Sequence, residues 1–218
     1  MVFFPHEYAH SFTAWLLGWK SNPFALNYAH PTLTVLLVQM GIDQNVNELP
    51  IFASGHGRDA AFIGAAGMVI GNGLITYPLS RLGYTMAMRR NLRGWAMFFY
   101  GTTVASVGNF IDYVPVRTFS NSGDMFSLER GLGWSPWTVL IILGIPTGWA
   151  LIYFLVGIQP VAVSWIFPNS ASRRVVLLTV AVLWGFYGAG GLIEGGPAAY
   201  QMSKISVFVL LPLVTLLS

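Results

Sequence analysis

The chain has 218 residues, of which 55% are hydrophobic and 9% are charged, and its formal net charge is +3. Soluble globular proteins carry about 25% charged residues, so this composition excludes an ordinary soluble enzyme, and its apolar excess excludes a disordered chain. The small net charge gives no indication of nucleic-acid binding. The chain contains no cysteine, which excludes disulfides, thiolate metal ligands and cysteine nucleophiles.

Long uncharged segments separate the charged residues, as in polytopic membrane proteins. A span needs about 20 apolar residues to cross about 30 Å of hydrocarbon. Four segments meet this length, and two shorter ones, residues 1–19 and 205–218, are interpreted as partial spans; the four are residues 60–79, 94–111, 136–158 and 175–193. We predict a single all-α polytopic membrane domain over residues 1–218 with about 5–6 transmembrane helices, because lipid offers no partner for unpaired backbone groups.

The stretch from residue 21 to residue 59 differs from the spans. It is rich in turn residues, and within it residues 33–39 are β-branched and too short to cross a bilayer. We therefore expect one or two strands of a hairpin at the membrane edge, directly after the first helix.

Arginines suggest an orientation. A short acid-free loop holds Arg81, Arg89, Arg90 and Arg93, and a second basic loop holds Arg173 and Arg174. Both loops lie on one side if the four long spans alternate, and the positive-inside rule places that side in the cytoplasm. We expect a multi-pass protein in the plasma or inner membrane of a prokaryote.

Residues 6–10 read His-Glu-Tyr-Ala-His, the pattern H-E-x-x-H. Residues four apart share one helix face, so His6 and His10 can bind one ion. Glu7 can reach a water molecule held by that ion, the arrangement for metal-assisted hydrolysis. The alternative is a pair of histidines satisfied by neighbouring groups. An ionisable cluster in an apolar helix is costly, however, and indicates a function.

A catalytic zinc has three protein ligands and one open position, so a third ligand must come from elsewhere. The order of the predicted spans places residues 112–130 on the side where the first helix ends. There, a span ends in carboxylates followed by a proline and a turn-rich loop that can fold back. The full set of candidates is His30, His56, Asp43, Glu48, Asp59, Asp112, Asp124, Glu129 and Glu194.

With these motifs, residues 1–130 resemble the site-2 protease family of intramembrane zinc metalloproteases. Residues 3–18, with H-E-x-x-H, resemble its first core helix. The segment Ala66-Gly67-Met68 is similar to the Ala-Gly-Pro-like turn of the family, with methionine in place of proline. Residues 112–115 resemble Asn-x-x-Pro, with aspartate in place of asparagine, and residues 123–125 are similar to its aspartate motif, with glycine before the aspartate.

The resemblance implies a metalloprotease core in residues 1–130 and additional transmembrane helices in residues 131–218. It implies one zinc ion held by His6, His10 and Asp124, with Glu7 as the general base and later the proton donor. Asp112 stays open as an alternative ligand or as a carboxylate that orients a ligand histidine. Asn109 is a possible substrate-binding residue.

A positional argument also favours Asp124. Pro115 has no N–H and ends the helix, and the turn formers in residues 118–123 let the chain reverse. We expect Gly123 to allow a close approach of Asp124 to the first helix. If residues 1–19 alone spanned the membrane, His6 and Asp124 would lie roughly 20 Å apart. Either further helix lies upstream of Met1 or this helix starts in the middle of the bilayer, and we favour the first.

We therefore predict a zinc metalloprotease that cleaves peptide bonds in or near transmembrane segments of membrane proteins or peptides. The first alternative is a membrane zinc hydrolase acting on a lipid or another small substrate. The second is a non-enzymatic membrane scaffold or transport component with a structural metal, which a fourth protein ligand would support. A strand within residues 21–59 favours a peptide substrate, because it can pair with an extended chain.

Overall fold

The structure is a computed structural model that describes residues 2–28, 42–166, 172–193 and 195–217. The described residues are mostly helical, which confirms the all-α class. Among them one small sheet pairs β1 (Asn27–Tyr28) antiparallel to β2 (Ile42–Asp43), and it follows the first helix. The strand expected at residues 33–39 lies outside the described residues.

The chain folds into two compact units, and each is described by itself. The first comprises Met1–Thr76 and Ser122–Ser135, and the second comprises Tyr77–Asn121 and Pro136–Ser218. The predicted core, residues 1–130, is thus divided between them. The helical elements of the first unit are α1 (Phe3–Leu16), α3 (Glu48–Ala53), α4 (Gly57–Ala66), η1 (Gly67–Thr76) and α7 (Gly123–Leu132).

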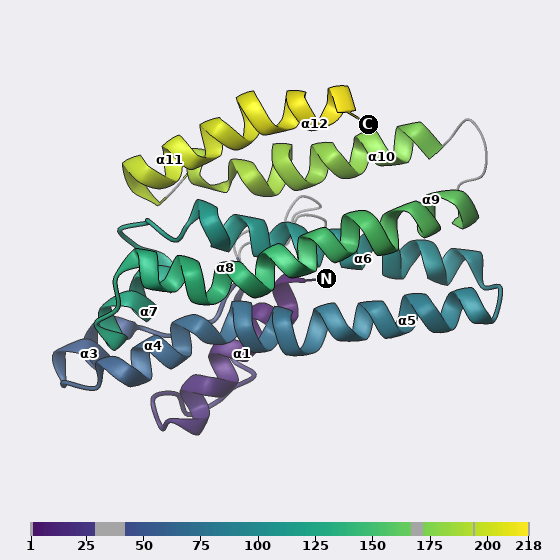
Figure 1. Cartoon of the computed structure of the whole chain (residues 1–218). Helices are drawn as coiled ribbons and strands as arrows, with labels where there is room; N and C mark the ends of the chain where they lie inside the picture. The colour runs from purple at the N-terminus through teal and green to yellow at the C-terminus, as the bar shows by residue number, and fades with distance from the viewer. Residues whose placement is uncertain (1, 29–41, 167–171, 194, 218) are drawn as a thin grey trace. The chain divides into compact units, whose positions relative to one another are not determined.

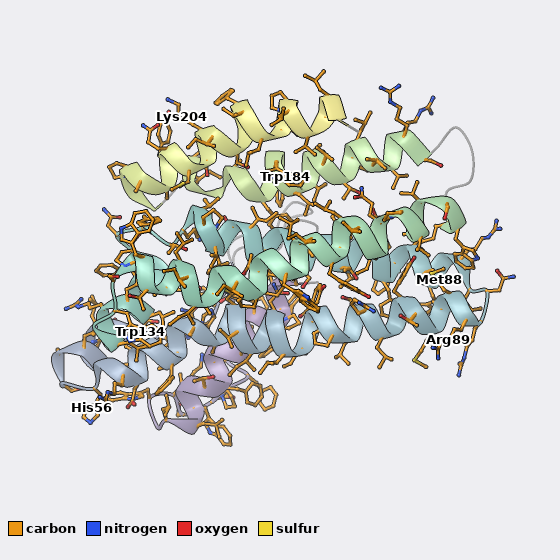
Figure 2. The ribbon with its side chains drawn as sticks, viewed as in Figure 1. His56, Met88, Arg89, Trp134, Trp184 and Lys204 are labelled. Carbon is orange, nitrogen blue, oxygen red and sulfur yellow. The ribbon has the colours of Figure 1, made fainter. Side chains whose placement is uncertain are left out.

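In the second unit, long helices run alongside one another (Figure 1). Their packed core includes Tyr100, Val107, Phe154 and Trp184, the last labelled in Figure 2. The elements of this unit are α5 (Tyr77–Arg89), α6 (Arg93–Ile111), η2 (Asp112–Val116), α8 (Pro136–Tyr153), η3 (Phe154–Ile158), α9 (Gln159–Ile166), α10 (Ser172–Val180), η5 (Ala181–Phe186), η6 (Tyr187–Leu192), α11 (Gly196–Ile205), η7 (Ser206–Leu210) and α12 (Leu211–Leu217).

Four continuous helices among the described residues are long and apolar enough to cross a membrane: Gly57–Arg89, Pro136–Ile166, Ser172–Leu192 and Gly196–Leu216. Three of them include all or nearly all of a predicted span. The fourth corrects the interpretation of residues 205–218 as a partial span, because residues 205–216 continue a helix that begins at Gly196.

The structure does not confirm five or six spans. Residues 94–111 form a helix, α6, but it is not among the four candidates, because threonine, serine and asparagine dilute its apolar residues. The first helix, α1, has 14 residues and ends before Gly18, whose φ of +83° terminates it. At 1.5 Å per residue, α1 is about 21 Å long and shorter than a full span.

Candidate metal centre

The first unit is organised around α4 and η1, which present one face of small residues to α1. A Cβ added at Gly67 would collide with the imidazole nitrogens of His6 and His10, and one added at Gly71 would collide with the backbone of Pro5 and His6. Ile63 lies one turn before Gly67 on the same face, and its carbonyl contacts His10. Small residues four apart let two helices approach to backbone contact. They therefore seat the histidine pair of α1 directly on this helix.

A second small-residue face of α4 receives α7. A Cβ added at Gly131 would collide with the carbonyl of Gly57, and one added at Gly64 would lie 2.8 Å from the carbonyl oxygen of Asp124 and 3.1 Å from Cβ of Ser127. The hydroxyl of Ser127 also donates a hydrogen bond to the Glu48 carboxylate at the start of α3. These contacts fix the height of α7 along α4. Asp124, in the first turn of α7, thereby lies level with the histidines on α1.

The two packings bring three ligand side chains together. The Nε2 atoms of His6 and His10 are 3.0 Å apart, and Oδ2 of Asp124 lies 3.4 Å from the first and 3.3 Å from the second. Both imidazoles are 1% exposed. Among the described residues, these three form the group of His, Asp and Glu side chains that could hold a metal ion.

A backbone carbonyl orients His10 and sets its tautomer. Nδ1 of His10 lies 2.5 Å from the carbonyl oxygen of Ile63. A carbonyl can only accept, so Nδ1 carries the proton. Nε2 of a neutral His10 then has a free lone pair that faces His6 and Asp124. Metal-binding histidines are commonly held in this way, with the second ring nitrogen donating to a carbonyl or a carboxylate.

The donor set fits a zinc ion. Two atoms bound to zinc at about 2.0–2.1 Å and at the tetrahedral angle lie about 3.3–3.4 Å apart, close to the three observed separations. Burial opposes ionisation of Asp124, but when the Nε2 atoms carry protons instead of binding an ion, the charge of His10 and the hydrogen bonds from both histidines outweigh it. They hold the pKa of the Asp124 carboxyl well below its usual value. Two imidazole nitrogens and a carboxylate are ligands that zinc takes in proteins.

Glu7 is buried beside this group and is held by the chain that follows β2. Its carboxylate accepts a hydrogen bond from the backbone N–H of Gln44, and it interacts electrostatically with His10 and Asp124. Its Oε2 atom is buried and has no hydrogen-bond partner among the described residues. A buried carboxylate oxygen without a partner is costly, and it leaves Glu7 an atom with which to accept a proton.

Two other predicted site residues, Asp112 and Asn109, are not in the first unit. Asp112 belongs to the second unit, where Nε of Arg117 donates to it at 3.2 Å. The carbonyl of Ile63, and not Asp112, is thus the acceptor that orients His10. Asn109 is buried in α6, also in the second unit, and its role in substrate binding stays a prediction.

The remaining candidate ligands are not part of the group. His56 is exposed and contacts the ring of Trp19 and the hydroxyl of Ser54. Glu48 accepts from Ser127, Asp59 accepts from Trp19, and Glu129 is buried in α7. His30 and Glu194 lie outside the described residues.

Two contributors were not assigned to the site from the sequence. Gly67 was recognised as part of a small-residue face, yet its role is to leave room for the imidazole nitrogens. Its place in the Ala-Gly-Met segment was the signal available. The carbonyl of Ile63 carries no signal in the sequence, because every residue has one.

The role expected for Gly123 is corrected. A Cβ there would meet nothing within 4 Å, so the glycine does not serve a close approach. Its φ of +79° is the reason for a glycine at this position, where α7 begins. The close approach to Asp124 is made by Gly64 instead.

Neither a protein-family model nor a curated protein nor a solved structure matches the chain. The functional argument therefore depends on the geometry and chemistry of the residues themselves.

Proposed function

We propose that this chain is a membrane-embedded zinc metalloprotease, as its resemblance to the site-2 protease family suggests. The observation that carries the proposal is the convergence of His6, His10 and Asp124 within 3.4 Å of one another, with Glu7 buried at the adjoining position of the same helix. The four apolar helices, each long enough to cross a membrane, support a membrane-embedded site.

In this proposal each residue has a separate task. His6, His10 and Asp124 would hold one zinc ion, which lowers the pKa of water and polarises a carbonyl group. Glu7 takes the proton from the attacking water and returns it to the leaving amine. Ile63 keeps the lone pair of His10 directed into the site. Gln44 fixes one oxygen of Glu7, which leaves the other for the proton.

The substrate would be a peptide bond in or beside a transmembrane segment of another protein. A carbonyl inside a helix is already hydrogen-bonded, so the substrate helix must partly unwind before its carbonyl can react. The two-stranded sheet follows α1 and is linked to the site through the chain at Gln44. Pairing of an extended substrate with a strand of this sheet is the binding mode that such an element offers.

The number of ligands favours a catalytic over a structural metal. In the described part of the chain three side chains form the group, and three protein ligands with one open position are typical of catalytic zinc. Hydrolysis of a lipid or a small molecule would use the same ion and base. The strand pair beside Glu7 is the feature that favours a peptide.

The test is cleavage of membrane-inserted peptides by the purified protein. A panel of single-span peptides, each with a helix-breaking residue at a different depth, would be incubated with the protein in liposomes and analysed by mass spectrometry. We expect cleavage that is lost with a chelator, restored with zinc and abolished by Glu7→Gln. Cleavage that persists at the same rate in Glu7→Gln would refute the proposal. Release of fatty acid without peptide cleavage would favour the lipid hydrolase.

A further inference from the structure

Five arginines gather at one end of the second unit. Arg89, Arg90 and Arg93 lie at the turn from α5 to α6, and Arg173 and Arg174 lie at the start of α10. Arg81 lies about two turns earlier in α5, against the ring of Tyr153, and is not part of this group. The turn between α5 and α6 lies at the same end as the end of α9 and the start of α10 (Figure 1), and Arg89 is labelled there in Figure 2. We call these five residues, Arg89, Arg90, Arg93, Arg173 and Arg174, the arginine end.

Contacts within the second unit tie these segments together. The guanidinium of Arg93 lies 5.8 Å from the ring centroid of Trp165 near the end of α9. Trp165 and Val175 pack on the same core as Ala87 and Ala96, which come from α5 and α6. The arginine-bearing ends of α5, α6 and α10 are therefore neighbours in space.

The arginine end has no acidic counterpart. The sequence contains no Asp or Glu between Asp59 and Asp112, or between Glu129 and Glu194. In the part of the chain that the structure describes, none of the five arginines forms an ion pair with a carboxylate. All five are exposed. Their mutual repulsion is not offset by any group of this unit that the structure shows.

The helices themselves gain nothing from this charge. Arg93 is the first residue of α6, and Arg173 and Arg174 stand in the first turn of α10. Neither helix has an acidic residue in its first turn. Cations at a helix N-terminus oppose the helix dipole. An anion supplied from outside the chain would satisfy both the arginines and the dipoles.

The surroundings indicate the depth of this cluster in a membrane. Trp95 is 58% exposed, meets Phe98 edge-on and stacks on Phe99, and these three rings lie two to six residues beyond Arg93. Exposed tryptophan next to arginine is typical of the headgroup region, where the ring lies at the apolar boundary and the cation reaches the phosphates.

We propose that the arginine end is a binding site for anionic phospholipid, with the guanidinium groups on the lipid phosphate and the exposed aromatic side chains beside the acyl chains. Arginine binds phosphate oxygens in pairs through its planar fork. Basic clusters between transmembrane helices bind anionic headgroups in this way. The apolar residues that border the cluster distinguish a lipid from a free phosphate, which has no chains to cover them. This inference is independent of the metal centre.

The experiment is native mass spectrometry of the full chain, titrated in detergent with phosphatidylglycerol or phosphatidylcholine of the same acyl chains. We expect phosphatidylglycerol to bind more tightly, and salt to weaken it. The triple variant Arg89→Gln/Arg90→Gln/Arg93→Gln should lose about fivefold affinity for each arginine, roughly a hundredfold in total. The control Arg58→Gln/Arg130→Gln/Lys204→Gln removes the same charge outside the arginine end and should bind as the unmodified protein does. Lys204 and Arg89 lie at opposite ends of the second unit (Figure 2).

Three outcomes would overturn the inference. Equal affinity for the two lipids would show that the headgroup charge is not recognised. Equal losses in the triple variant and in its control would show that only net charge matters. Displacement of the lipid by millimolar inorganic phosphate would identify a site for free anions. Circular dichroism in detergent checks that the triple variant remains helical, since its three arginines are surface residues.

Discussion

The Nε2 atoms of His6 and His10 face each other at 3.0 Å in the buried part of the first unit. Two lone pairs at this separation repel unless a proton or a cation lies between them. Because Nδ1 of His10 donates to Ile63, the ring cannot turn away without leaving that carbonyl unpaired. The pair is therefore held ready for a cation, and the fold gains stability when one is bound.

Zinc removal should therefore destabilise the protein. A ligand that binds only the folded state stabilises it by about 2.7 kcal/mol at 100 times its Kd. We expect a chelator to lower the Tm of the unmodified protein and of Glu7→Gln alike, because the three ligands remain in both. The Tm of a His6→Ala/His10→Ala variant should not respond to the chelator. Stoichiometric zinc in that double variant, measured by plasma mass spectrometry, would place the metal elsewhere.

Asp124→Asn tests the third ligand. The amide lacks the negative charge that complements the cation, so zinc content should fall to a small fraction of one ion per chain. Asp112→Asn is the matched control, since it makes the same change in a carboxylate that pairs with Arg117. It should keep its zinc although the ion pair is weakened. The opposite pattern would make Asp112 the ligand.

Gly67→Ala tests the space beside the imidazoles. The new methyl group would collide with Nε2 of both histidines, so we expect loss of zinc together with overpacking of about 1–3 kcal/mol. Gly148→Ala in α8 is the control, because a Cβ there meets nothing within 4 Å. Alanine at that helical position should be neutral or stabilising, by up to about 1 kcal/mol. Normal zinc content in Gly67→Ala would mean that the helices are further apart than described here.

Glu129 should make stability depend on pH. Burial raises its pKa from 4.5 to about 7, so between these values the folded state binds the proton more tightly than the unfolded state. Stability is then highest below about pH 4.5 and falls as the pH rises towards about 7. We expect Glu129→Gln to remove this part of the pH dependence of Tm. Identical profiles for the two proteins between about pH 5 and 8 would show that Glu129 is solvated.

The sequence predicted the histidine pair and its partner for different reasons. His6 and His10 follow from one helical turn, a local relation that spacing alone reveals. Asp124 is 118 residues from His6, and it was singled out only by the family resemblance and by a proline and a turn-rich loop before it. The break was located correctly: Val114 leaves helical geometry directly before Pro115. The way in which Asp124 approaches the histidines was not predicted, because the packing of α7 on Gly64 could not be read from residue spacing.

The helix limits show what composition can and cannot decide. Residues 60–79 and 136–158 were predicted as spans, and both lie in long apolar helices, because uncharged length is a local property of the sequence. The end of α1 depended on a single glycine with positive φ. The start of the last long helix at Gly196 was missed because glycine, proline and polar residues interrupt the apolar pattern there. Tertiary packing decides where such helices begin and end. It also decides that residues 77–121 belong to the second unit, although they separate α1 and α4 from α7 in the sequence of the first unit.

This separation has a consequence for biosynthesis. His6 and His10 leave the ribosome first, and the third ligand follows 118 residues after His6, about 6–24 s later at 5–20 residues per second. During that interval the nascent chain has two of its three candidate ligands, and the face of α4 that packs against α7 is uncovered. The ligand set is complete only when the chain returns from residues 77–121 and α7 docks. A chain that stalls or is truncated before Asp124 would therefore carry an incomplete ligand set in the membrane.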